Sequence, residues 1–169
     1  MNISPFIAQM KVNAERIRIF TEGVSNEQAR WKPDPDSWSI LEVINHLYDE
    51  EREDFRVRLD IFLHHPSDPL PPIDPQAWVT NRKYNERDLT ESVNNFLAER
   101  EKTLTWLQSL ASPNFDAIYT SPFGQMSAGD MFASMVSHDL LHLRQLVELH
   151  WAYTVKQFLP YHGGYAGDW

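Results

Sequence analysis

Hydrophobic residues recur at helical spacing in four long segments of the chain, and breaks rich in proline or polar residues separate these segments. Phe6, Met10, Ile17 and Phe20 illustrate the pattern in the first segment. Each segment has the length of a helix that buries one face against its neighbours. The predicted helices cover approximately residues 5–22, 39–64, 89–110 and 127–155.

Residues that favour helix ends support these limits. Ser4 is expected to cap the first helix, with Pro5 in its first turn and Gly23 after its end. Ser39 and Ser127 each stand three positions before an acidic residue, which is the spacing of a capping box. The second and fourth helices are therefore predicted to begin at these two serines.

The connections between the helices differ greatly in length. Residues 65–87 include five prolines, and a connection this long in a compact domain is usually functional or disordered. Its aromatic residues favour an ordered crossover packed over the bundle. A short hairpin or extended turn is expected around Pro122 and Gly124. The predicted fold is all-α, a single domain over residues 1–169 that forms a four-helix bundle with a long crossover between helices 2 and 3.

Composition narrows the classes of function. The chain has no cysteine, so a metal ion would have to be held by His, Asp or Glu, and no cysteine nucleophile is present. The net charge of −9 argues against a nucleic-acid partner, which needs a basic surface. We see no apolar run long enough to span a membrane and no signal-peptide pattern. A cytoplasmic protein without a membrane partner is expected.

Two histidines stand four residues apart in "SHDLLHLRQL". His138 and His142 share one face of the predicted fourth helix and can reach one metal ion. They lie in a stripe with Met131, Met135 and Leu149 that should face the bundle interior. Buried imidazoles need partners, which a metal ion or protein hydrogen bonds could supply. Both readings, metal ligands and hydrogen-bonded core histidines, remain open at this point.

His46 in the second helix is the best candidate for a third ligand. Three histidines with open positions would form a catalytic rather than a closed structural site, and would suit Zn, Ni, Fe, Mn or Co. Glu50 follows one turn later and could act as a base or orient a ligand, although a solvated acid in the run "DEEREDFR" is the simpler reading. Gln145 points with the histidine pair and could contact bound water or substrate. Asp139 is expected to point away from the pair.

The stretches "SWSILEVINHL" and "SPFGQMSAGDMFASMVSHDLLHLRQL", in this order and separation, resemble the DinB-like (DinB/YfiT) superfamily of metalloenzymes. The family pattern falls on His46, His138 and His142, with Arg144 and Gln145 following. The resemblance implies a four-helix bundle, a divalent metal ion held by the three histidines, and a homodimer. Relatives include S-transferases that use bacillithiol and isomerases that use mycothiol.

These inferences together predict a metal-dependent enzyme that acts on a small-molecule substrate, as a transferase using an exogenous low-molecular-weight thiol. Metal-assisted hydrolysis with Glu50 as base is an alternative. A non-catalytic metal-binding module of the stress response, and a metal-free helical domain, are others. Four aromatic residues could wall a pocket for an apolar electrophile or could simply fill the core: Trp78, Tyr84, Tyr161 and Trp169.

Overall fold

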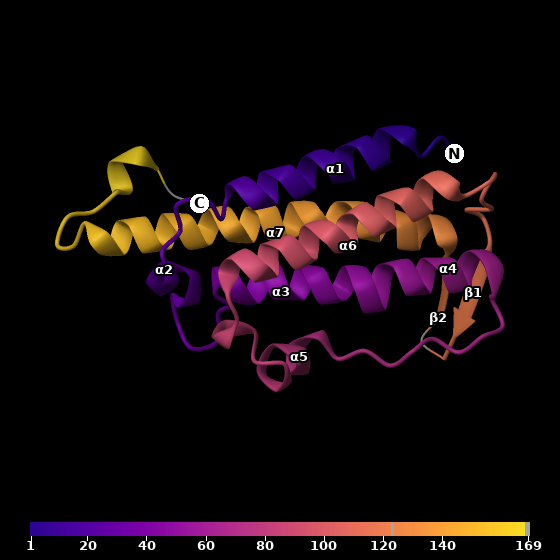
Figure 1. Cartoon of the computed structure of the whole chain (residues 1–169), viewed down its shortest axis with the longest axis horizontal. Helices are drawn as coiled ribbons and strands as arrows, with labels where there is room; N and C mark the ends of the chain where they lie inside the picture. The colour runs from indigo at the N-terminus through magenta and orange to yellow at the C-terminus, as the bar shows by residue number, and fades with distance from the viewer. Residues whose placement is uncertain (123, 168–169) are drawn as a thin grey trace.

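The computed structural model describes residues 1–122 and 124–167, and it confirms the predicted four-helix bundle (Figure 1). The second long helix is continuous but not uniform, because a π-helical segment lies in its middle. The long helices are α1 (Ser4–Ile19), α3 (Ile40–Asp49) followed by the π segment η1 (Glu50–Phe55) and α4 (Arg56–His64), α6 (Leu89–Ser109), and α7 (Ala128–Gln157).

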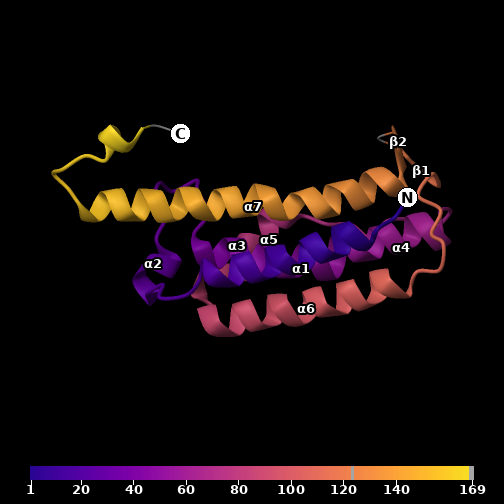
Figure 2. The ribbon, with the colours of Figure 1, turned by 90° about the horizontal axis from the view of Figure 1, so that it is seen from above.

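The long crossover follows from the direction of the helices. The segment α3–η1–α4 runs parallel to α6, whereas α1 and α7 run the opposite way (Figures 1 and 2). The chain must therefore return along the whole bundle between α4 and α6, and it does so in residues 65–88 (Figure 1). The shorter elements are α2 (Asn26–Arg30), α5 (Pro75–Asn81), η2 (Tyr84–Glu86), β1 (Ile118–Ser121), β2 (Gly124–Ser127) and η3 (Gly164–Ala166).

Of the three serines predicted to cap helices, two do so and one does not. Ser39 and Ser127 both form the predicted capping boxes. The expectation that Ser4 caps α1 is wrong, because Ile3 occupies the N-cap and no side chain caps this end. The predicted hairpin is present, with β1 and β2 paired antiparallel directly before α7.

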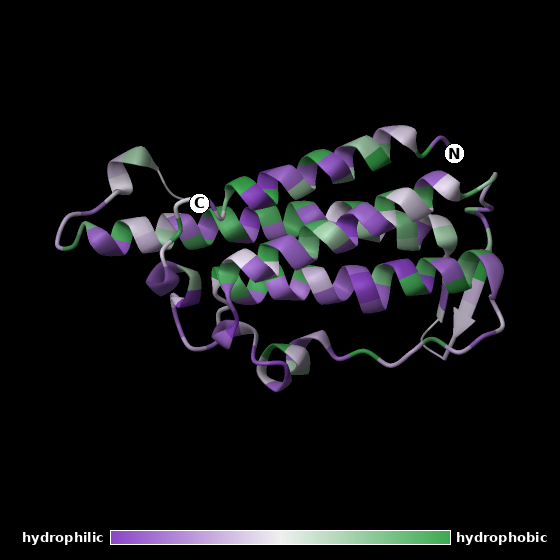
Figure 3. Ribbon diagram, in the orientation of Figure 1, coloured by the Kyte–Doolittle hydropathy of each residue, from purple (hydrophilic) through white to green (hydrophobic). Residues whose placement is uncertain are grey.

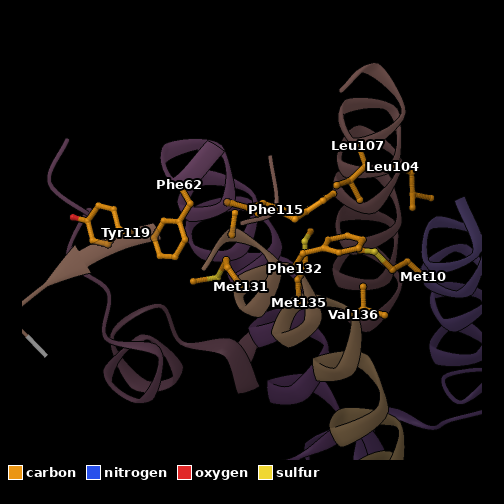
Figure 4. Close-up of a cluster of buried hydrophobic side chains, with 12 residues drawn as sticks. Met10, Phe62, Leu104, Leu107, Phe115, Tyr119, Met131, Phe132, Met135 and Val136 are labelled. Carbon is orange, nitrogen blue, oxygen red and sulfur yellow. The ribbon is translucent and has the colours of Figure 1, made fainter. Parts of the chain in front are cut away.

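The bundle interior consists of two apolar clusters with a polar layer between them. One cluster joins α1, α4, α6, α7 and the hairpin, and centres on residues such as Phe62, Leu107 and Phe132 (Figure 4). The other joins α1, α3, α6 and α7 around Ile44 and Phe96. Figure 3 shows the hydrophilic middle of α3–η1–α4 between more hydrophobic stretches. The candidate metal ligands lie in this polar layer.

The end of α7 extends past the other helices, and the chain then turns back toward the helix through η3 (Figures 1 and 2). Within the described residues, none of the helices combines the length and the hydrophobicity that a membrane span requires.

Candidate metal centre

Three imidazole rings from two helices meet in the polar layer. His46 comes from α3, and His138 and His142 come from consecutive turns of α7. The Nε2 atom of His138 lies 3.1 Å from Nε2 of His142 and 3.4 Å from Nε2 of His46. One nitrogen from each ring lies within 4.8 Å of the others, so the structure brings all three sequence-predicted ligands together.

These separations fit one bound cation. Two imidazole nitrogens bound to the same tetrahedral ion at about 2.0–2.1 Å stand about 3.4 Å apart. Without a metal ion, the hydrogen-bonding capacity of the rings is used less fully. Nε2 of His138 can donate at most one hydrogen, although it lies close to Nε2 of both His46 and His142. The donor set of this chain therefore fits a divalent metal ion.

In two of the three rings, the opposite nitrogen faces an acceptor that favours the ligand tautomer. His142 Nδ1 lies 2.8 Å from Oε1 of Gln145, which can accept only from a protonated Nδ1 and leaves Nε2 free to bind a metal. His46 Nδ1 faces Oε1 of Glu50 at 4.0 Å, and both atoms are buried without a hydrogen-bond partner. Gln145 thus contacts a ligand ring, and Glu50 is aligned with a second one.

Burial keeps the three rings neutral, as metal ligands must be. Removal from water, and then the neighbouring imidazoles His142 and His138, lower the pKa of His46 to about 2. Burial first, followed by His142 and the Arg100 guanidinium, lowers the pKa of His138 to about 3. The pKa of His142 is also lowered by burial, against the opposing effect of its bond to Gln145.

Glu50 is not the solvated acid that the charged run around it indicates. Its side chain is buried in the first turn of η1, beside the ligand helix. Burial, and then the nearby carboxylate of Asp54, raise the pKa of Glu50 to about 8. The π-helical turn that places these acids inside the bundle was not predicted, and such turns often occur at functional sites.

A pocket of about 650 Å³ opens onto two of the three histidines. His46 and His142 form part of its wall, together with Trp38 and Gln145. The Trp38 ring lies parallel to the His142 ring at 6.3 Å and is 4.8 Å from the His46 ring. We did not assign Trp38 to the site from the sequence, although it stands in the "SWS" segment that starts the ligand helix.

The aromatic residues proposed as a pocket wall lie elsewhere. Tyr84 is fully buried, and its hydroxyl donates to Asp49. Trp78 packs against the Arg82 guanidinium, and Tyr161 belongs to the exposed C-terminal segment. Trp169 lies outside the described residues. The three described aromatics are therefore absent from the lining of the histidine pocket.

The environment of Asp139 was also not fully predicted from the sequence. Asp139 points away from the histidine pair as expected, yet it is buried and binds the guanidinium of Arg100 on α6. The sequence carries a weak signal for this pair, since an arginine stands amid the apolar positions of α6. The helical pattern alone does not say which acid Arg100 meets.

The structure resembles that of YfiT from Bacillus subtilis, described as a probable metal-dependent hydrolase with an unusual four-helix bundle topology. The TM-score is 0.78 at 16% sequence identity, over 89% of this chain and 86% of that one. Comparison with curated protein sequences finds no match. The sequence model of the DinB superfamily matches residues 9–146, a span that contains all three histidines, and the chain belongs to this superfamily.

Proposed function

We propose that this protein is a divalent-metal-dependent enzyme, and that it transfers a low-molecular-weight thiol to an electrophile. The observation that carries the proposal is that three Nε2 atoms meet beside a pocket large enough for small molecules, whose wall includes His46 and His142. His46, His138 and His142 would hold the ion. A bound divalent ion lowers the pKa of a coordinated thiol or water and so supplies a nucleophile at neutral pH.

The protein's own residues would orient the reactants. Gln145 keeps the Nδ1 hydrogen of His142 in place, so that Nε2 stays directed at the ion. Glu50 would accept the Nδ1 hydrogen of His46 in the same way, from the side of the ring away from the convergence point. Trp38 provides an aromatic wall against which an apolar substrate group can pack.

A thiol is favoured over water by the need for a base. A free thiol ionises near pH 8.5 and water only near 15.7, so a bound thiol needs less help from the protein. Glu50 lies behind the His46 ring, and the carboxylates that line the pocket, Asp36 and Glu148, are exposed or partly exposed. Since the chain has no cysteine, the thiol would come from solution. We also propose a cytoplasmic location, where such thiols stay reduced.

Metal-assisted hydrolysis is the second candidate. In this reaction the ion would activate water, and Glu50 would act through the Nδ1 hydrogen of His46, which it faces, rather than on the water directly. The description of YfiT as a probable metal-dependent hydrolase supports this candidate. A metal-binding module without turnover is the third candidate. The experiment described next distinguishes it from the two enzymes.

The first experiment measures metal content and turnover together, on protein purified without a histidine tag. We expect about one equivalent of divalent metal per chain, lost in His142→Ala but retained in His64→Ala, because His64 is exposed, pairs with Asp60 and does not belong to the three-histidine cluster. Turnover is followed with a chromogenic aryl halide plus cysteine or glutathione, and with a chromogenic ester alone.

The outcomes separate the three functions. Metal-dependent product formation only with added thiol supports the transferase, and ester cleavage without thiol supports the hydrolase. Bound metal that raises the melting temperature without any turnover supports a binding module. Wild-type protein that takes up no divalent ion would overturn all three. We also propose a homodimer, which would give twice the chain mass in light scattering.

A further inference from the structure

A buried arginine connects all four helices of the bundle in the same polar layer as the histidines. Arg100 projects from α6, and its side chain is only 3% exposed. It meets Glu51 of η1 on one side and Asp139 of α7 on the other. It also donates to the backbone oxygen of Met10 in α1 at 3.0 Å.

The guanidinium of Arg100 has every one of its N–H donors engaged. Nη1 and Nη2 donate to the two oxygens of Asp139 at 2.8 and 2.7 Å. Nε and Nη2 donate to the two oxygens of Glu51 at 2.9 and 2.8 Å. With the bond to Met10, these contacts account for the five donors of the group. Two bidentate pairs on one guanidinium fix the positions of both carboxylates closely.

Each of these carboxylates is tied to a metal-ligand helix. Asp139 directly follows His138 in α7 and stands one turn before His142. Glu51 directly follows Glu50, which faces the Nδ1 atom of His46. Arg100 therefore bridges the helix that supplies one ligand and the helix that supplies the other two.

Stability alone is a poor explanation for this cluster. Burying an ion pair costs desolvation energy, and well-packed hydrophobic side chains often replace such pairs without loss of stability. The cluster also has more negative than positive charges, which favours a cation nearby. A nearby metal site therefore explains these two features of the cluster better than a contribution to stability does.

We propose that Arg100 is a positioning residue of the metal site, which holds His46 in register with His138 and His142. This inference rests on the proposed metal-dependent function. In the absence of the bridge, α7 and the α3–η1 helix could shift relative to one another. The three nitrogens would then no longer meet at one ion.

The test is cobalt binding by Arg100→Met and by Glu51→Gln, measured by titration and by the visible absorption spectrum of the bound ion. We expect both variants to bind Co²⁺ about ten- to a hundredfold more weakly, as for other partners that orient metal ligands. The spectrum should also change, because it reports the coordination geometry. Neither readout responds to a residue that only adds stability.

Arg56→Met is the matched control. Arg56 of α4 also forms an ion pair with a buried acid of α6, Glu99, but its bonds join α4 to α6 and do not reach α7, which carries two of the ligands. This variant should bind cobalt within about twofold of the wild type, even where its melting temperature falls.

Circular dichroism checks the fold of each variant. If Arg100→Met does not fold, Glu51→Gln decides the result, because it preserves the side-chain shape and leaves Arg100 paired with Asp139. Unchanged cobalt affinity and spectrum in a folded variant would overturn the positioning role alone. Failure of the wild type to bind cobalt would instead overturn the proposed function.

Discussion

At the scale of single residues, the site depends on which nitrogen of each histidine carries the hydrogen. The 2.8 Å contact with Gln145 fixes this for His142, and Glu50 stands in the corresponding place for His46. A ligand histidine whose second nitrogen is held in this way keeps its ring orientation and binds metal more strongly. Gln145 is therefore better described as an orienting residue than as a group that attacks substrate.

Gln145→Leu should weaken metal binding by about ten- to a hundredfold, because the Nδ1 hydrogen of His142 would lose its acceptor. Competition with a metal-binding dye measures the affinity. Arg144→Ala serves as the control, since Arg144 is exposed and its ion pair is with Glu148. Equal affinities in wild type and Gln145→Leu would contradict the orienting role.

At the scale of elements, the π segment decides what the second long helix presents to the interior. The run "DEEREDFR" has the composition of a solvated helix face, yet most of its acids are buried within or beside η1. Each is paired with a cation or lies beside the histidines, as the energetics of buried charge require. The buried acids are Asp49, Glu50, Glu51 and Asp54.

The N-terminal cap of α3, the helix that carries His46, is a second feature at the scale of elements, and it contributes to stability. Ser39 accepts from the backbone N–H of Glu42 and donates to Oδ1 of Asn85, and it is fully buried. Ser39→Ala should lower the free energy of unfolding by about 2 kcal/mol, because it removes the cap and leaves the buried N–H of Glu42 and the half-buried Asn85 without this partner.

Asp88→Ala is the matched comparison, because Asp88 caps α6 with a single hydrogen bond to the N–H of Glu91. We expect a smaller loss of about 1 kcal/mol. Urea unfolding gives both values. If Ser39→Ala lowers the free energy of unfolding no more than Asp88→Ala does, burial of the Ser39 cap adds nothing to its contribution to stability.

At the scale of the whole molecule, the fold divides its core into two apolar clusters and one polar layer. Every long helix contributes polar residues to that layer, as Asn13 in α1 and Arg100 in α6 show. The pocket leads from this layer to the surface past Asp36 and Glu148, and no lysine or arginine lines it among the described residues. The charge of the pocket therefore disfavours anionic groups away from the metal end.

We expect electrophiles that carry an amine to react with a kcat/KM about fivefold higher than matched electrophiles that carry a carboxylate. We expect no larger effect, because the two carboxylates are exposed or partly exposed and the solvent screens their charge. The ratio should fall in high salt and in the double variant Asp36→Asn, Glu148→Gln. A preference for the carboxylate substrates would show that the bound ion, rather than the pocket wall, controls selection.

The sequence by itself determined the four long helices, the capping serines Ser39 and Ser127, and the three candidate histidines. These features depend on local spacing: helical periodicity places His138 and His142 on one face whatever surrounds them. His46 was the best candidate for a third ligand from its place in the second helix, the family resemblance agreed, and the structure brings its ring to the pair. Helix boundaries, set by prolines and caps, were also predicted to within a few residues.

Only the tertiary structure decided which charged residues are buried. Glu51 meets Arg100 across 49 positions of sequence, and no local pattern distinguishes such an acid from a solvated neighbour. The π turn, the Trp38 wall and the alignment of Glu50 with His46 depend in the same way on the packing of separate segments. A buried charge needs a partner, and the partner of Glu51 comes from another helix, so only the fold brings these two residues together.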